Sequence, residues 1–214
     1  MAVAVTWAGA TYLNVVRVHP DGTTYPVRGA YPATASTTGS TTTIYDYEAP
    51  LDVAVSYLVM APNVPRATAT SNTVTLASGG NVWLGHAGDA TLNRIVAIKR
   101  QPERLRRLDR GVFAIIGRPK AVVVTSGVRQ DPAGELTVYT DSATETADML
   151  ALLADGSPLL LRTPPGYGWD PLTWIAVGDV VEVPWRDFDG DDGRREFRLP
   201  YVEVDSPTTV SGAA

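Results

Sequence analysis

The stretch GRPKAVVVTSGVRQDPAGELTVYTDSATETADMLALLADGSPLLLRTPP, residues 117–165, decides the fold. The β-branched run at 122–124 and the alternation of polar and apolar residues at 135–140 are each typical of a strand. Between them, residues 129–134 contain a proline and a glycine, which favour a reversal of the chain. We therefore predict a hairpin of these two strands, followed by one helix and a return strand at 159–161.

The helix is predicted from its two ends. Ser142 stands three residues before Glu145, the spacing of a capping box that satisfies free amides at a helix start. Gly156 is placed to end the helix, so we expect it to span about 143–155. Its buried face is expected to consist of Met149, Leu150, Leu152 and Leu153. One helix in an otherwise β chain, with no reactive groups around it, favours assembly over catalysis.

Composition excludes several classes of function. The chain has 214 residues, of which 44% are hydrophobic, and a net charge of −5, which gives no general attraction to nucleic acid or anionic membranes. The absence of cysteine excludes disulfides and thiolate metal sites. Residues 1–16 lack the basic leader and apolar core of a signal peptide. No apolar run reaches the roughly 20 residues of a membrane helix, so we expect no membrane partner.

Two β domains are predicted. Residues 1–78 show short strands and turns that indicate a β-sandwich, and 77–80 is a small, uncharged boundary. Residues 79–205 form the second domain, a β-barrel or split barrel with the one helix. Residues 206–214 are expected to be a flexible tail. The segment 46–50 followed by Tyr57 resembles the tyrosine corner of immunoglobulin-like and fibronectin type III-like sandwiches, in which a Tyr hydroxyl bonds to nearby backbone.

Candidate chemical groups are few. His19 flanks a turn and His86 lies near Asp89, but neither accompanies a nucleophile motif, so we expect structural roles. The acidic stretch 187–192 resembles a Ca²⁺ loop in composition but departs from its spacing, so we expect an exposed hairpin tip that binds no metal. No phosphate-binding or dinucleotide-binding motif is present. We therefore predict no catalytic, cofactor-binding or metal-binding residues and no enzymatic activity.

A basic segment at 94–120 is the main charge feature. It contains only two acids, against nine basic residues: Arg94, Lys99, Arg100, Arg104, Arg106, Arg107, Arg110, Arg118 and Lys120. The segment lacks the interleaved aromatic residues of single-strand binders, so we predict no nucleic-acid specificity. We expect it to meet the acidic stretch 179–205, in the same chain or in a neighbour. The predicted interface residues are Arg104, Arg106 and Arg107, together with Trp169 in the aromatic loop 164–171.

Most of the chain resembles minor tail proteins of the tail tip in long-tailed phages (siphoviruses) of actinobacteria. The resemblance is carried by VWLGH (82–86), 111–129, 134–168, VGDVVEVPW (177–185), VRGA (27–30) and YDYEAPLDVAVSY (45–57). It implies a structural virion protein, assembled in the host cytoplasm into a ring at the tail tip, whose partners are other tail proteins and copies of itself. The family has no catalytic residues to assign.

Two alternatives stay open. In the first, the sandwich is a binding module whose loops, 31–43 or 164–171, hold carbohydrate of the host surface. In the second, the protein is a cell-wall hydrolase, which requires paired carboxylates in a cleft. No such pair is evident from the spacing, so the hydrolase ranks last.

Overall fold

The computed structural model is mainly β, with 51% of residues in strands and one α-helix. It describes residues 1–6, 12–31, 33–34, 41–61, 67–99, 103–185 and 193–207. Internal contacts group the chain into two compact units, Met1–Val82 with Arg162–Leu172 (unit 1) and Trp83–Leu161 with Thr173–Ala214 (unit 2). Segment 162–172 therefore belongs to unit 1 by its contacts. Independent folding of two domains, with a boundary at 77–80, stays a prediction.

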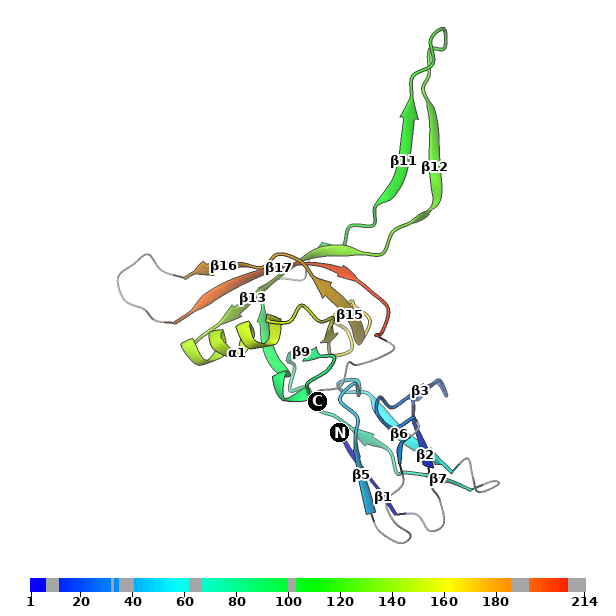
Figure 1. The fold of residues 1–214 in the computed structure, drawn as a ribbon, viewed down its shortest axis with the longest axis vertical. Coiled ribbons are helices and arrows are strands. Elements are labelled where there is room, and N and C mark those ends of the chain that lie inside the picture. Colours follow the sequence, from blue (N-terminus) through cyan, green and yellow to red (C-terminus); the bar gives the residue numbers. More distant parts are fainter. Residues whose placement is uncertain are drawn as a thin grey trace. The chain divides into compact units, whose positions relative to one another are not determined.

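Unit 2 is built on a closed barrel of six antiparallel strands (Figure 1). The order around the barrel is β13-β10-β9-β14-β15-β17, and β13 pairs back to β17 to close it, while β16 pairs with β17 outside the ring. The elements in this part of the chain are β9 (Val82–His86), a 3₁₀ turn η1 (Ala90–Leu92), β10 (Arg94–Ile98), β11 (Leu108–Phe113), β12 (Val122–Arg129), β13 (Ala133–Thr140), α1 (Ala143–Leu153), β14 (Leu159–Arg162), β15 (Leu172–Val177), β16 (Val181–Pro184) and β17 (Arg195–Glu203). The predicted barrel with one helix is confirmed.

Alternation along β13 and β17 fills the barrel. Leu136 and Val138 are fully buried, and the register places them opposite Leu199 and Phe197, which are equally buried. Directly opposed apolar side chains of neighbouring strands stabilise a sheet. The intervening residues of both strands are more exposed. The period-two pattern at 135–140 therefore indicated the correct strand and the correct inward face.

Helix α1 begins as predicted. Ser142 accepts a hydrogen bond from the backbone N–H of Glu145 at 3.2 Å. The Glu145 carboxylate accepts in return from the backbone N–H of Asp141 at 2.7 Å, one residue before the cap. Gly156 follows the helix with a φ of +67°, a conformation that favours glycine.

The buried face of α1 differs from the prediction. Met149 (3% exposed) and Leu152 (1%) are buried, whereas Leu150 is 45% exposed and Leu153 is only half-buried. Residues three apart share a helix face, and the neighbouring positions point about 100° away. The four apolar residues span too wide an arc for all of them to face the barrel.

The predicted hairpin at 129–134 is wrong. Strand β12 pairs with β11, and β13 pairs with β10 and β17. The chain does not reverse at 129–134, because these residues pair with the segment 105–107. The backbone N–H of Gln130 donates to the carbonyl of Arg107 at 2.8 Å, and that of Ala133 donates to the carbonyl of Leu105 at 2.9 Å. These bonds carry the chain from the β11–β12 hairpin directly into the barrel.

Unit 1 contains a two-stranded sheet, β1-β5, and a six-stranded sheet with the path β3-β2-β6-β7, in which β4 pairs with β2 and β8 with β6. These pairings do not confirm an immunoglobulin-like or fibronectin-like sandwich. The core is aliphatic, with Leu13, Val15 and Val55 almost fully buried around Tyr57. The strands are β1 (Ala2–Thr6), β2 (Tyr12–Val18), β3 (Thr24–Pro26), β4 (Ala33–Thr34), β5 (Thr41–Tyr45), β6 (Ala54–Met60), β7 (Thr68–Thr70) and β8 (Val74–Thr75).

Within the described residues, no helix is both long enough and apolar enough to span a membrane.

Candidate interaction surface

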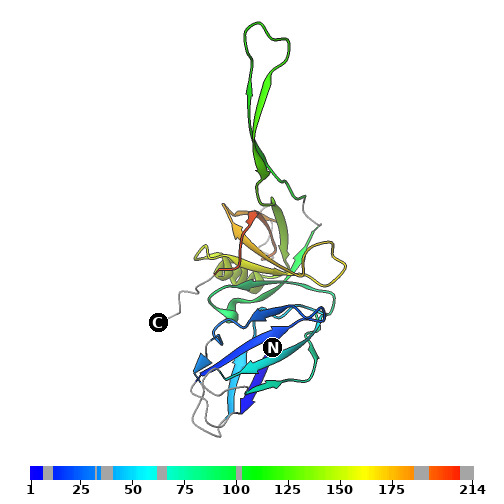
Figure 2. The same cartoon turned by 90° about the vertical axis from the view of Figure 1, so that its right-hand side faces the viewer.

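An antiparallel hairpin, β11–β12, extends beyond the barrel of unit 2 in both views (Figures 1 and 2). Its ladder runs without interruption from Arg110 to the pair of Phe113 and Val122. The register shifts between Leu108 and Arg110, opposite the part of β12 where Gly127 has a φ of +78°. A bulge of this kind bends and twists a strand. It therefore sets the direction in which the hairpin leaves the barrel.

The tip of the hairpin is a β-turn that presents an isoleucine. Arg118 donates its backbone N–H to the carbonyl of Ile115 at 3.0 Å, and Gly117 supplies the positive φ (+86°) that the third turn position of a type II turn requires. Ile116, the second turn residue, is 103% exposed. The turn therefore holds a large apolar side chain entirely in solvent.

Both faces of the hairpin are apolar and exposed. Val112 pairs with Val123 and is 59% exposed, while its partner is 53% exposed. On the other face Phe113 folds over Gly111, where a Cβ would lie 2.7 Å from the ring, and Val124 pairs with this glycine. A lone two-stranded hairpin is marginal in water. Contiguous exposed apolar residues mark interaction sites, so this hairpin has the character of an interface element.

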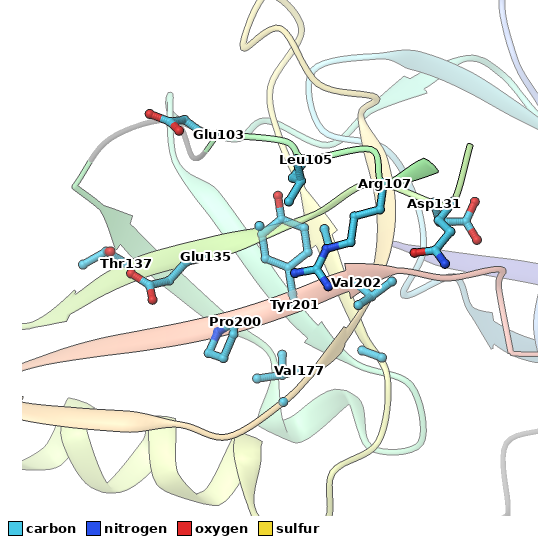
Figure 3. A pocket seen from close by; sticks show the side chains of 15 residues that line it. Glu103, Leu105, Arg107, Asp131, Glu135, Thr137, Val177, Pro200, Tyr201 and Val202 are labelled. Atoms are coloured by element: carbon cyan, nitrogen blue, oxygen red, sulfur yellow. The ribbon is translucent and has the colours of Figure 1, made fainter. Parts of the chain in front are cut away.

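A groove of about 920 Å³ lies at the root of the hairpin; we call it the root groove (Figure 3). The segment 103–107 borders it, together with the strands β13, β15 and β17. Its apolar lining consists of Leu105, Ala133, Ala176, Val177, Pro200, Tyr201 and Val202. Its charged lining consists of Glu103, Arg107, Asp131 and Glu135.

The segment beside the groove is held tightly to the barrel. Leu105 and Ala133 exchange two backbone hydrogen bonds of 2.7 and 2.9 Å. Next to them Gly134 passes under the segment, where a Cβ would lie 2.5 Å from the carbonyl oxygen of Glu103 and 2.9 Å from the Tyr201 hydroxyl. Only glycine permits this approach, so Gly134 fixes the wall of the root groove.

The groove is acidic overall, since three carboxylates face one guanidinium. Figure 3 shows Glu103 and Glu135 toward one side of the groove, and Arg107 reaching toward Tyr201 with Asp131 on its far side. Within the described residues neither the Glu103 nor the Glu135 carboxylate forms a hydrogen bond or salt bridge, although the charge of Glu135 acts on Arg198, which binds Glu196.

The predicted interface residues fall into different surroundings. Arg104 is partly buried and donates to Glu203 at 2.6 Å. Arg106 is exposed, and its carbonyl accepts from Arg129 at 3.2 Å. Arg107 lines the root groove. Trp169 is half-buried in a loop of unit 1, whereas the three arginines belong to unit 2. The arginines flank one groove, and their role at an interface stays a prediction.

Part of the basic segment is paired within the chain. Lys99 lies 3.2 Å from Glu196, and Arg104 binds Glu203, so two acids of the 179–205 stretch are already engaged. Arg94 forms a third pair, at 3.2 Å, with Asp148 of α1. The basic residues of the hairpin, among them Arg118 and Lys120, form no pair with a described residue. The basic charge that is not paired within the described residues therefore lies on the hairpin and on Arg106 and Arg107 at its root.

The histidines occupy structural positions. His86 accepts the backbone N–H of Gly88 and of Asp89 on Nδ1, which leaves Nε2 to donate to Asp155 at 3.0 Å. The amide of Ser157 and then this imidazole lower the pKa of Asp155 to about 2. The ring links the loop after β9 to the end of α1. Asp89, which is near His86 in the sequence, contacts the ring through its backbone N–H, and the carboxylate partner is Asp155.

His19, which is half-buried, contacts a buried polar cluster of Arg17, Asp46 and Tyr57 in unit 1. Arg17 donates to His19 Nε2 at 3.1 Å and to Asp46 Oδ2 at 2.8 Å, and the Tyr57 hydroxyl donates to the same oxygen at 2.9 Å. Burial, and then the charge of Arg17, lower the pKa of His19. The Tyr57 hydroxyl thus bonds to a carboxylate and not to the backbone expected of a tyrosine corner. This cluster ties β2 and β6 to the segment after β5.

Exposed tyrosines gather in unit 1. Tyr45 and Tyr47 stack with ring centroids 5.8 Å apart at 12°. All tyrosines that are strongly exposed in the described residues belong to this unit: Tyr12, Tyr25, Tyr31, Tyr45, Tyr47 and Tyr167. Tyrosine combines an apolar body with a polar tip and is enriched at interfaces.

Three predicted features fall on residues outside the described parts of the chain. The acidic stretch 187–192 lies wholly outside them. The loop 31–43 lies outside them at 32 and 35–40, and the tail 206–214 does so from 208 onward. Among the residues that are described, no three His, Asp or Glu side chains converge on a point where a metal could bind.

Comparison of the sequence with protein-family models and with curated proteins finds no match.

Proposed function

We propose that this chain is a structural subunit of the tail tip of a long-tailed phage, which assembles in a ring with copies of itself and neighbouring tail proteins. The observation that carries the proposal is the β11–β12 hairpin, which exposes apolar side chains on both faces and at its tip. Covering these side chains removes apolar surface from water, at about 25 cal/mol per Å². A neighbouring subunit supplies that cover.

The barrel supports this role because closure leaves few free strand edges. A closed barrel is a rigid body from which a hairpin can reach a neighbour without distorting the fold. The resemblance of 82–86, 111–129 and 134–168 to minor tail proteins gives the proposal its biological setting. The immunoglobulin-like character of unit 1 is part of the same proposal, with unit 1 as an adaptor or decoration.

The test is incorporation into particles. A phage that lacks a working copy of this gene is grown on a host that supplies the chain, and its virions are analysed by quantitative mass spectrometry. We expect a triple variant, Val112→Thr, Ile116→Thr and Val123→Thr, to be incorporated at least about tenfold less, because threonine keeps the β-branched shape but loses the apolar contact. The matched control is the exposed pair Val180→Thr and Val181→Thr, near and on β16. Incorporation of the triple variant at the parental level would overturn the proposal.

A second candidate function is favoured by the tyrosines of unit 1. Their exposed rings, with the stacked pair Tyr45 and Tyr47, offer flat surfaces on which a sugar ring can pack. Under this proposal unit 1 binds carbohydrate of the host surface. A glycan array with the full chain tests it: binding that is lost in Tyr45→Ala with Tyr47→Ala supports the module, and no binding at any glycan rejects it.

A further inference from the structure

We infer that the tip of the β11–β12 hairpin docks into the root groove of a second copy of this chain. The inference rests on the assembly function proposed above and names the contact that forms the assembly. Two features of unit 2 carry it: an apolar, basic tip whose charged side chains pair with none of the described residues, and an apolar, acidic groove of matching character. Both lie on the same chain, so each copy offers one of each.

The tip has a defined chemistry. Ile115 is 44% exposed and Ile116 is 103% exposed, on a turn held by its own backbone hydrogen bond. Arg118 and Lys120 follow directly, and no acid occurs between Asp109 and Asp131. A tip of this kind fits a site with an apolar floor and a negative rim.

The root groove has such a floor and rim. Leu105, Val177 and Pro200 line it, and Val202, 46% exposed, contributes an uncovered apolar side chain. Glu103 and Glu135 both lie toward one side of the groove, apart from each other and away from Arg107 in the view of Figure 3. Opposite charges at a rim steer encounter and fix orientation. The two carboxylates therefore place Arg118 and Lys120 at their side of the groove, and Arg107 excludes the reverse orientation.

The tip of the hairpin cannot reach the root groove of its own chain. Strand β11 (Leu108–Phe113) advances roughly 17 Å, at about 3.3 Å per residue, and the tip residues lie beyond its end. Beyond the register shift the ladder is regular from Arg110 to Phe113, and both views show the hairpin extending away from the barrel (Figures 1 and 2). The tip therefore lies far from the groove at its own root, so a tip that occupies this groove comes from another copy.

The contact is head-to-tail, because the tip of one copy meets a different surface on the next. A heterologous contact generates a ring when its rotation closes and a filament when it does not. The β-bulge near Gly127 sets the angle of the hairpin and hence the rotation between copies. The geometry thus connects one local feature to the symmetry of the assembly.

Cross-linking through introduced cysteines tests this inference. Because the chain has no cysteine of its own, the cross-linker reacts only with the introduced thiols. Ile116→Cys and Val202→Cys are prepared as two separate full-length proteins, mixed, and treated with a short bismaleimide. We expect a cross-linked dimer that contains one of each. The matched control is Val128→Cys, 74% exposed on the hairpin shaft, mixed with Val202→Cys, which should yield at least about tenfold less mixed dimer.

A charge exchange provides the second arm. Arg118→Glu with Lys120→Glu should weaken self-association about tenfold or more in sedimentation velocity, and Glu103→Lys with Glu135→Lys should do the same. Mixing the two variants should restore association, because the opposite charges then face each other in exchanged positions. Asp141→Lys with Asp205→Lys, two exposed sites outside the groove, changes the net charge equally and should leave association unchanged.

The outcomes separate this inference from the proposed function. Association that persists with tip-to-tip cross-links, or without rescue by the exchanged charges, overturns docking in the groove but leaves assembly through the hairpin intact. A chain that neither associates nor enters virions overturns both.

Discussion

Replacing Asp46 with alanine should destabilise unit 1 severely. The carboxylate is 2% exposed and accepts from Arg17 at 2.8 Å, from Tyr57 at 2.9 Å and from the backbone N–H of Glu48 at 3.0 Å. The Arg17 side chain is only 4% exposed, so removal of Asp46 leaves a buried guanidinium without its counter-charge. Breaking a buried pair in this way costs about 3–5 kcal/mol.

A second buried cation raises the expected cost toward the upper end of that range. Arg162 is 3% exposed; burial lowers its pKa, and the nearby charge of Asp46 opposes this shift. The free energy of unfolding of a native protein is about 5–15 kcal/mol in total. The Asp46→Ala substitution should therefore remove a large fraction of the free energy of unfolding of unit 1.

The assay is urea unfolding of the full chain followed by hydrogen-exchange mass spectrometry, which reads the two units separately. Glu48→Ala is the matched control, because its pair with Arg28 leaves both side chains more than 20% exposed and such pairs contribute about 0–1 kcal/mol. We expect the loss for Asp46→Ala to appear in peptides of unit 1. A cost no larger than that of Glu48→Ala would refute the reasoning.

Three further outcomes are expected. Leu152→Ala should cost about 2–5 kcal/mol in thermal or urea unfolding, and Leu150→Ala less than about 1, because only the first side chain is buried; equal costs would show that the helix face is assigned wrongly. Burial, and then Asp46, raise the pKa of Tyr57 above its usual value near 10, so the neutral phenol is favoured in the folded state. The stability of unit 1 should therefore fall as pH rises above about 10, less steeply in Tyr57→Phe, and parallel profiles would contradict this. Gly134→Ala should cost about 1–3 kcal/mol and increase hydrogen exchange of 103–107, because its Cβ meets the carbonyl of Glu103.

The elements with strong local patterns could be predicted from the sequence. Period-two alternation at 135–140 identified a barrel strand, and the capping box at Ser142 identified the helix and its start, whereas the helix ends at Leu153, two residues before the predicted end. Each of these signals arises from interactions within a few residues. They can therefore be recognised in the sequence without knowledge of the fold.

Which strand pairs with which could not be predicted from the sequence in the same way. Residues 129–134 have the composition of a turn, and Gly117 followed by Arg118 and Pro119 is a second candidate for reversal. Local chemistry does not choose between them; the long-range bonds of 105–107 to 130–133 do. The apolar residues on both sides of Gly117, in GVFAIIGRPKAVVV, were the signal for the hairpin that the sequence interpretation did not use.

The candidate site was predicted only in part for the same reason. The basic segment at 94–120 drew attention to Arg107, but the groove it lines depends on Val177 and Pro200, far away in the chain. Conversely, Arg104 looked available to a partner, and the fold pairs it with Glu203. Charge patterns identify candidate residues, and only the topology decides which of them have internal partners.

The most direct test of the central claim is an electron cryomicroscopy map of purified virions of the phage that encodes this chain. We predict copies of the chain in a ring at the tail tip, with the β11–β12 hairpin of each copy covered by a neighbouring subunit. A map in which the hairpins project into solvent, or virions that do not contain the chain, would contradict it.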